Sequence, residues 1–244
     1  MINLFEEFKQ EREERINSNG TNTALVDAAK AFNIESNKAK YSYNFSWMGR
    51  PIIQYPQDMI AMQEIIWEVK PDLIIETGIA HGGSLVYYAS LLEVIGNGQV
   101  LGIDIDVRAH NRKAIEEHPM KKRIEIIEGS ALDEKVIDQV KQFAEGKNKI
   151  LVCLDSNHTH AHVLEELKLY SPFVSLNSYI VVFDTIVEDL PEGYLPGRAW
   201  SVGDNPKTAV YEFLKENDQF VIDKSIDNKL LISVTPHGYL KRVK

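Results

Sequence analysis

The stretch that decides the fold is Leu73-Ile-Ile-Glu-Thr-Gly-Ile-Ala-His-Gly-Gly-Ser84. Three apolar residues lead into an acid, and glycines then precede Ser84. Glycine allows a sharp turn and a close approach to a ligand, and the first N–H groups of a following helix can bind an anion. The stretch therefore predicts a buried strand, a tight turn and a helix that starts at a binding site. Ordinary tight packing of the turn is the alternative.

Short apolar runs continue along the chain and alternate with helical patterns. We expect strands at Leu73–Ile75, Val100–Ile103, Ile124–Ile127, Ile150–Leu154, Tyr179–Phe183, Phe220–Ile222 and Leu230–Val234. Helical spacing is found between residues 59 and 69 and near 84–95, 108–117, 134–144, 160–170 and 207–216. This alternation predicts an α/β fold with a mostly parallel sheet. The polar link 223–229 predicts a turn between the last two strands, so at least one of them is antiparallel.

The first 57 residues differ from the rest and predict a helical and looped extension before a main domain at 58–244. Residues 1–18 have an amphipathic pattern, followed by a polar break at 17–22. We expect this helix to lie on the surface and pack on the core, with a contact between subunits as the alternative. We also expect a homo-oligomer. The aromatic, proline-containing stretch 41–57 predicts a loop or cap.

Composition restricts the class of protein. Among 244 residues, 27 are Lys or Arg and 36 are Asp or Glu, for a net charge of −9. This charge disfavours nucleic-acid binding. Cys153 is the single cysteine, which excludes an internal disulfide and fits a reducing compartment. It lies in an apolar run, so we expect it to be buried and inert. The charged N-terminal stretch and the absence of a long apolar segment predict a cytoplasmic location without a membrane span.

Residues after the first three strands indicate a nucleoside cofactor, because ligands of open α/β sheets bind at the carboxyl ends of the strands. Asp104 can accept the hydroxyls of a ribose, and Ser130 can border an adenine ring. The turn lacks G-x-G-x-x-G, and Asp104 follows Glu76 by 28 residues, beyond the ~20 of the dinucleotide fingerprint. A nucleoside site without a pyrophosphate cradle points to S-adenosylmethionine.

The next two strands end in Asp155 and Asp184, and two neighbouring carboxylates suit Mg²⁺. Each aspartate alone could instead cap a helix or belong to a turn. His158, His160 and His162 follow Asp155. At the start of a helix, steps of two residues turn the side chains apart, so a three-histidine metal site is disfavoured. His158, nearest to the strand, is a candidate general base or substrate contact.

Several motifs in order resemble those of the cephalosporin hydroxylase family, which is also known as rhamnosyl O-methyltransferases. The similarity spans about residues 41–240 and rests on Asn44-Phe-Ser-Trp-Met-Gly-Arg-Pro-Ile-Ile-Gln54, Pro71–Ser84, Leu154-Asp-Ser-Asn-His-Thr-His160, Val182-Phe-Asp-Thr185, Asn205-Pro-Lys-Thr-Ala209 and Asn228–Val234. The resemblance implies the seven-stranded, Rossmann-like sheet of S-adenosylmethionine-dependent methyltransferases, with helices on both faces and an antiparallel last strand.

The resemblance also implies site residues. Glu76, Gly78, Ala80, His81 and Ser84 would line the methionine end of the cofactor, which Asp155 also borders; Asp104 would hold the ribose and Ser130 would lie near the adenine. Asp155 and Asp184 would hold Mg²⁺. The antibiotic-modifying branch has an acidic pair where this chain has Phe183 and Asp184. Thr185 or water would therefore complete the metal site. We find no two-histidine, one-carboxylate iron site of the oxygenase kind.

The sequence thus predicts a Mg²⁺-assisted O-methyltransferase for a sugar or another small polyhydroxyl acceptor, in cell-surface polysaccharide or secondary-metabolite biosynthesis. Asp155 or His158 would take the hydroxyl proton. Residues of the loops that cap the cleft would contact the acceptor: Trp47, Arg50, Tyr55, Arg198 and Trp200. Simple packing of these loops is the alternative for each of them. An oxidoreductase or hydroxylase on the same fold, and a non-catalytic S-adenosylmethionine-binding subunit, are the competing functions.

Overall fold

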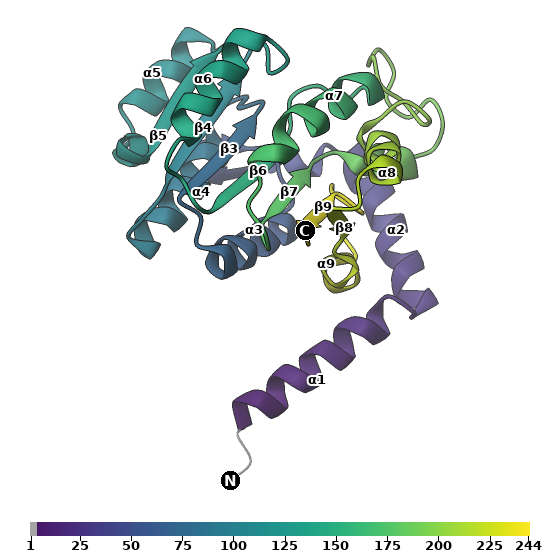
Figure 1. The fold of residues 1–244 in the computed structure, drawn as a ribbon. Coiled ribbons are helices and arrows are strands. Elements are labelled where there is room, and N and C mark those ends of the chain that lie inside the picture. Colours follow the sequence, from purple (N-terminus) through teal and green to yellow (C-terminus); the bar gives the residue numbers. More distant parts are fainter. Residues whose placement is uncertain (1–3) are drawn as a thin grey trace.

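A seven-stranded sheet forms the centre of the computed structural model, which describes residues 4–244 (Figure 1). Its strand order is β5-β4-β3-β6-β7-β9-β8. All neighbours are parallel except β9, which is antiparallel to both β7 and β8. The strands are β3 (Leu73–Thr77), β4 (Gln99–Asp104), β5 (Ile124–Glu128), β6 (Ile150–Leu154), β7 (Tyr179–Val182), β8 (Phe220–Ile222) and β9 (Tyr239–Arg242). The expected α/β class and the antiparallel last strand are confirmed.

Helices cover both faces of this sheet, which buries its central strands completely. Every residue of β3 and β6 is buried. One face packs against α3 (Pro56–Val69), α4 (Gly83–Ile95), α5 (Ala109–Glu116) and α9 (Lys224–Leu230), and the other against α6 (Glu134–Ala144), α7 (His160–Tyr170) and α8 (Pro206–Glu216). Four 3₁₀ turns complete the described chain: η1 (Tyr41–Asn44), η2 (Pro119–Arg123), η3 (Ser171–Phe173) and η4 (Thr185–Asp189). The helices that we expected between the strands are confirmed.

The expected turn at 223–229 and the expected last strand at Leu230–Val234 are both wrong. Residues 224–230 form α9, whose first turn is capped by the side chain of Asp223, and the last strand is β9. Segment 231–235 is not a strand because its polar groups bond elsewhere: the backbone N–H of Val234 donates to Asp58 at 2.9 Å. The polar residues in 223–229 therefore form a capped helix and not the turn that we predicted.

The N-terminal extension contains α1 (Leu4–Asn19), α2 (Thr23–Lys38) and a hairpin of β1 (Phe45–Trp47) and β2 (Arg50–Ile52). The helix expected at 1–18 is confirmed from residue 4, and its first three residues lie outside the described part. No described residue of α1 is buried, but the helix contacts α9, so it lies on the surface of the main domain and contributes nothing to the core. Figure 1 shows it at the periphery, away from the sheet. The helix α2 was not predicted. Stretch 41–57 holds η1 and the hairpin, and the boundary at residue 57 stays a prediction.

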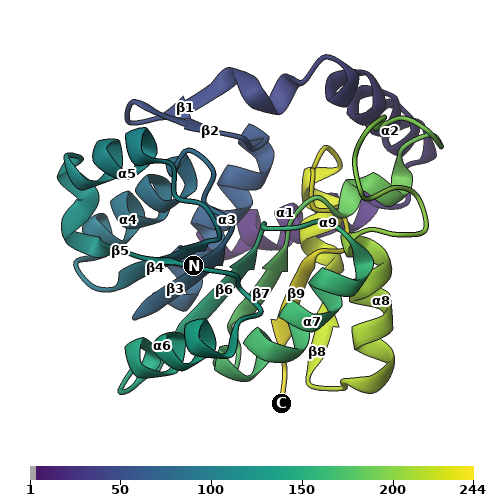
Figure 2. The ribbon, with the colours of Figure 1, turned by 90° about the horizontal axis from the view of Figure 1, so that it is seen from above.

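The hairpin and α2 lie across one end of the strands of the sheet (Figure 2). A Cβ on Gly83 would lie 2.1 Å from the carbonyl oxygen of Pro51, so the hairpin sits directly on the start of α4. No helix between residues 4 and 244 is long and apolar enough to span a membrane.

Asp58, on the first turn of α3, links this cap to the C-terminal segment. It is 1% exposed and accepts hydrogen bonds from the hydroxyls of Ser233 (2.6 Å) and Tyr239 (2.7 Å) and from Val234 N–H. Burial raises the pKa of Asp58 to about 6 despite these donors. The carboxylate thus joins α3, segment 233–234 and β9 at one buried point.

Asp58→Ala should lower the free energy of unfolding by about 3 kcal/mol or more, because a buried donor without a partner costs roughly 1–3 kcal/mol. Urea denaturation measures the loss. Asp138→Ala removes an exposed carboxylate of α6 that pairs with Lys141, and should change stability by less than about 0.5 kcal/mol. Equal losses in the two variants would contradict this role of Asp58.

Candidate functional site

A pocket of about 500 Å³ lies at the carboxyl ends of β3, β6 and β7. The chain runs from β3 outward to β4 and β5 and then returns to β6 on the other side, which leaves a crevice beside β3. Four groups of residues line it: Tyr43 and 51–54 of the cap; 78–81, 83 and 84 of the turn after β3; Asp155, Ser156 and His158 with Asp184; and Arg108 with Arg198 and Trp200. A larger groove of about 960 Å³ between α1, α3 and α9 lies elsewhere and contains none of the expected site residues.

The turn after β3 has a backbone that its glycines require. Gly78 has φ +80°, and a Cβ there would lie 2.1 Å from the carbonyl oxygen of Asp155. Ala80, with φ +43°, is also left-handed although it is not glycine. The loop that follows β3 and the loop that follows β6 are therefore in direct contact. Of the residues expected at the methionine end, Gly78, Ala80, His81 and Ser84 line the pocket, as does Asp155.

Glu76 lies beneath this turn rather than on the pocket wall. It is 1% exposed, and its Oε2 accepts a hydrogen bond of 2.7 Å from Ser84, while Oε1 has no partner. Burial raises the pKa of Glu76 to about 8, although the bond from Ser84 lowers it. A buried carboxylate with one unused oxygen beside the pocket is suited to a cationic group.

Asp104 and Ser130 lie at the ends of β4 and β5, outside the pocket lining. The Oδ2 of Asp104 accepts from the backbone N–H of Ile79 at 2.9 Å, and its Oδ1 from that of Asp106 at 3.0 Å. The Oγ of Ser130 accepts from Leu132 N–H at 3.3 Å. Asp104 therefore also holds the turn after β3, a role that the sequence did not indicate.

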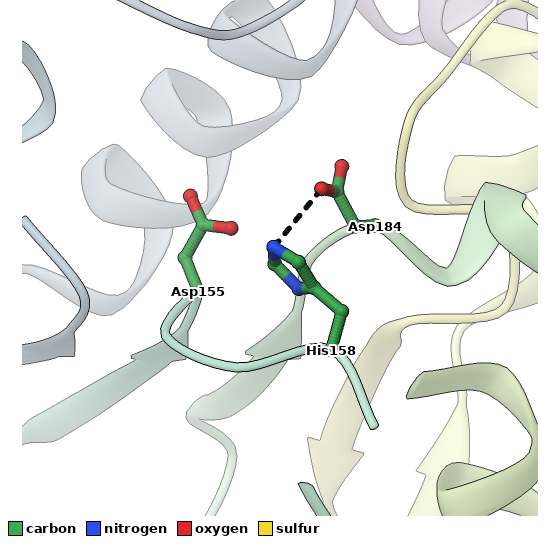
Figure 3. Close-up of side chains that lie close together, drawn as sticks. All are labelled: Asp155, His158 and Asp184. Atoms are coloured by element: carbon green, nitrogen blue, oxygen red, sulfur yellow. Dashed lines mark ion pairs between the residues drawn. The ribbon is translucent and has the colours of Figure 1, made fainter. Parts of the chain in front are cut away.

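Asp155, His158 and Asp184 converge on one point of the pocket wall (Figure 3). One ligand atom from each lies within 4.8 Å of the others, and Nε2 of His158 is 3.2 Å from Oδ2 of Asp184. Burial, and then the nearby charges of Asp184 and Glu76, raise the pKa of Asp155 well above its usual range. Two carboxylates and one imidazole are a donor set that can hold a divalent cation.

The other two histidines turn away from this cluster because they begin α7, as expected. Nδ1 of His160 lies 2.8 Å from the Thr208 hydroxyl, and its Nε2 pairs with Glu212. His162 Nε2 contacts the Ser156 hydroxyl at 3.2 Å, and Ser156 donates to the buried carboxylate of Glu166. A three-histidine site does not form.

The residues around Asp184 require a correction. The Thr185 side chain is fully buried, and its hydroxyl donates to the carbonyl of Pro236 at 2.8 Å, which makes the expectation that Thr185 completes a metal site wrong. Phe183 is 1% exposed within the core and provides no ligand atom. Cys153 is fully buried, as expected, and burial raises the pKa of its thiol.

Two of the five residues expected at the acceptor line the pocket. The Trp200 ring packs edge-on against His158 with centroids 4.7 Å apart, and the Arg198 guanidinium lies over the Trp200 ring. Both belong to segment 190–202, whose ends are held at Glu188, because its Oε2 accepts from Gly203 N–H and from the Asn205 side chain.

The other three residues support the cap and do not line the pocket. Trp47 donates to Ser90 at 3.0 Å. Arg50 donates to the carbonyl of His81 and to Asn111. Tyr55 is fully buried, and its hydroxyl bonds with Ser36 and Asn37 of α2. Simple packing, the alternative from the sequence, describes these three.

Some pocket residues were not predicted. Gln54 is 6% exposed, lines the pocket, and has an Oε1 without a hydrogen-bond partner. It ends the quoted motif Asn44–Gln54, which was the available signal. Tyr43, Arg108 and Ser156 also line the pocket.

The fold and the strand-end carboxylates define a class, the S-adenosylmethionine-dependent O-methyltransferases. Residues 39–243 match the family model described as Rhamnosyl O-methyltransferase/CmcI. The rhamnosyl O-methyltransferase of Mycobacterium tuberculosis is 34% identical over 201 residues, or 81% of this chain and 78% of that protein; the Mycobacterium leprae protein of that name is 29% identical over 200 residues, or 81% and 82%. The chain belongs to the Rhamnosyl O-methyltransferase/CmcI family.

Solved structures share the fold at lower identity. An apo structure of CmcI superimposes with a TM-score of 0.59 at 20% identity, covering 83% of this chain and 77% of that chain. A CmcI structure with Mg and SAM has a TM-score of 0.56 at 21% identity, covering 83% and 78%. An O-methyltransferase from Bacillus cereus in complex with SAH has a TM-score of 0.52 at 14% identity, covering 89% and 91%.

Gly78→Ala should lower the free energy of unfolding by about 2 kcal/mol more than Gly96→Ala. Both glycines are left-handed, but a Cβ on Gly96 meets nothing within 4 Å, whereas one on Gly78 meets the backbone of Asp155. Strain alone affects Gly96, and overpacking adds about 1–3 kcal/mol at Gly78. Urea denaturation measures both, and equal losses would show that the two loops can separate at no cost.

Proposed function

We propose that this enzyme transfers the methyl group of S-adenosylmethionine to a hydroxyl of a sugar or similar polyhydroxyl acceptor, with a divalent cation, Mg²⁺, beside the reacting oxygen. One observation carries the proposal: Asp155, His158 and Asp184 converge on the pocket that begins at the turn after β3. The turn that is expected to bind the cofactor and the three side chains that could bind the cation therefore line the same cavity.

The residues at the ends of β3 and β4 fit the cofactor. The unpartnered Oε1 of Glu76 can accept from the α-ammonium of the methionine part, and that positive charge would favour the ionised carboxylate. The start of α4, at Gly83 and Ser84, offers N–H groups to the methionine carboxylate. Asp104 would accept the ribose hydroxyls, and Ser130 would border the adenine.

Asp155 and Asp184 would hold Mg²⁺, which lowers the pKa of an acceptor hydroxyl when it is bound. In the reaction the hydroxyl oxygen forms a bond with the methyl carbon as the carbon–sulfur bond breaks. The positive sulfonium becomes a neutral thioether, and the hydroxyl proton leaves. Asp155 and His158 are the groups of this chain that could take that proton, and the pocket holds the oxygen in line with the methyl group.

A sugar acceptor is supported by the names of the relatives and by the rim of the pocket. The Mycobacterium relatives are rhamnosyl O-methyltransferases. Trp200 offers an aromatic surface of the kind on which a sugar ring packs, and Gln54 has a free amide oxygen that could accept from a sugar hydroxyl. The particular sugar is set by segment 190–202 and the cap.

The competing functions differ in support. An oxidoreductase is disfavoured, since the Mycobacterium relatives are rhamnosyl O-methyltransferases. A non-catalytic cofactor-binding subunit would bind S-adenosylhomocysteine and methylate no acceptor, alone or with partners.

We also propose a cytoplasmic location, from the single reduced Cys153, and a homo-oligomer, from the exposed apolar residues Leu4 and Phe8 of α1.

Asp104→Ala should weaken S-adenosylhomocysteine binding tenfold or more, because two charge-assisted hydrogen bonds are lost, each worth roughly 1.5–3 kcal/mol. Isothermal titration calorimetry measures the affinity, and a melting curve checks that the turn after β3 is intact. Asp106→Ala, at an exposed neighbouring carboxylate, is the matched control and should bind normally. Wild-type affinity in the Asp104 variant would remove this residue from the site.

Chelation should abolish methyl transfer, and Mg²⁺ should restore it, since two protein carboxylates leave positions that acceptor hydroxyls can occupy. S-adenosylhomocysteine should still bind without the cation. Asp184→Asn should mimic the chelator in both activity and bound metal, whereas Thr185→Ala should keep its metal because that hydroxyl bonds Pro236. Full activity after exhaustive chelation would leave Asp155 or His158 as an unassisted base.

A further inference from the structure

We propose that the acceptor sugar is anionic: it carries a carboxylate or a phosphate on the ring that is methylated, and the guanidinium of Arg198 binds that group. This inference rests on the proposed function and names the substrate class of the same pocket. It starts from Arg198 because this side chain lines the pocket, and its guanidinium N–H groups bond to no other residue between 4 and 244.

Most arginines of the described chain already donate to oxygens of the protein. Those that do so are Arg15, Arg50, Arg112, Arg123 and Arg242. Among the described residues, Arg12, Arg108 and Arg198 have no such partner, and the last two line the pocket. A guanidinium presents its N–H donors in a planar fork that fits a carboxylate or a phosphate. Two residues of the pocket wall are therefore available to bind an anionic ligand.

Arg108 and Arg198 lie on different sides of the pocket. Arg108 follows β4, whose end carries Asp104, so it lies on the side expected to bind the cofactor. Arg198 belongs to segment 190–202, which follows β7 and η4. Because β3 and β6 lie between β4 and β7, the two strand ends are three spacings of about 4.8 Å apart. On the acceptor side of the described pocket, Arg198 is therefore the guanidinium that can meet an anion.

The ring of Trp200 holds this guanidinium without using its hydrogen-bond donors. The guanidinium carbon lies over the Trp200 ring, 5.1 Å from the ring centre. An aromatic face attracts a cation through its quadrupole, whereas a carboxylate partner would have occupied the N–H fork. The contact therefore orients Arg198 and leaves its fork available to a ligand.

The distance to the reacting position places the anion on the methylated ring itself. The centre of the Trp200 ring, over which Arg198 lies, is 4.7 Å from the centre of the His158 ring beside the two aspartates. Guanidinium and imidazole can be no farther apart than these two distances together, which is about the length of one sugar ring with a substituent at each end. One end of the ring would meet Arg198 while a hydroxyl at the other end accepts the methyl group.

The charges of the pocket also favour an anionic acceptor over a neutral one. Asp155 and Asp184 face the proposed cation, and no described carboxylate lies within ion-pair distance of Arg198. A neutral sugar that covers Arg198 would remove water from the guanidinium without supplying an opposite charge, which is unfavourable. A carboxylate or phosphate would replace that water with charge-assisted, bidentate hydrogen bonds.

The test is isothermal titration calorimetry on the full chain saturated with S-adenosylhomocysteine and Mg²⁺. The carboxylate probes are methyl glycosides of glucuronic, galacturonic and mannuronic acid, each paired with its neutral methyl ester. The phosphate probes are monophosphates of glucose, galactose and mannose, each paired with the free sugar. At least one anionic probe should bind about tenfold more tightly than its neutral partner, because hydrogen bonds to charged groups are the strong ones. The series in which it occurs identifies the anion.

Variants assign this preference to Arg198. Arg198→Gln should abolish the preference for the anionic member of the pair, and Arg198→Lys should keep part of it, since lysine retains the charge but not the fork. Arg112→Gln is the matched control: it removes the same charge from α5, where Arg112 pairs with Glu128, and should leave the preference unchanged. Melting curves check that each variant folds, and Arg198→Met replaces Arg198→Gln if that variant does not.

Equal affinity within every pair would overturn the inference, and so would failure of every anionic probe to bind. A preference that survives in Arg198→Gln would also overturn it, because another group would then bind the anion. S-adenosylhomocysteine affinity of the wild type is measured in parallel, and its absence would mean that the proposed function fails. Methyl transfer to the neutral probes alone would leave the proposed function intact and overturn only the anionic acceptor.

Discussion

The site depends on one unfavourable contact, the proximity of two carboxylates. Asp155 and Asp184 end adjacent parallel strands, and the hydrogen bonds between β6 and β7 fix how close their side chains lie. Like charges at this distance in a partly buried position repel, which raises the pKa of Asp155, and a cation between the two carboxylates would relieve the repulsion. Nε2 of His158 lies 3.2 Å from Oδ2 of Asp184, beside the position that such a cation would take.

Close packing at the turn after β3 then determines where a second ligand can lie. Because Gly78 touches the backbone of Asp155, the turn that would contact the cofactor and the loop that carries the carboxylates behave as one wall. Asp104 fixes that turn from the other side through the N–H of Ile79. A methyl donor and an activated hydroxyl must meet within tenths of an ångström, and this wall provides the necessary rigidity.

Most strands of the sheet could be predicted from the sequence, because short apolar runs alternate with helical patterns. The convergence of Asp155 and Asp184 could also be predicted, because each follows a strand and the strands are parallel. The histidines of α7 were also predicted, since helical geometry turns His160 and His162 away. Two kinds of feature could not be predicted. Side-chain partners far apart in sequence decide the roles of Arg50 and Tyr55, which support the cap. Segment 224–230 is a helix rather than a turn because the side chain of Asp223 caps its first turn. The carboxylate of Asp58, far away in the sequence, accepts a hydrogen bond from Val234 in the segment that follows.

The anchoring of segment 190–202 has a consequence for how the family diversifies. Both ends of this segment meet at Glu188, where one carboxylate oxygen binds Gly203 and Asn205. Asn205 also forms the capping box that starts α8, so the return of the chain to the main fold is fixed independently of what lies between. Insertions, deletions and exchanges within the segment should therefore leave β7 and α8 in place. If Arg198 and Trp200 contact the acceptor as proposed, replacement of this one short loop would change the acceptor contacts without disturbing the sheet.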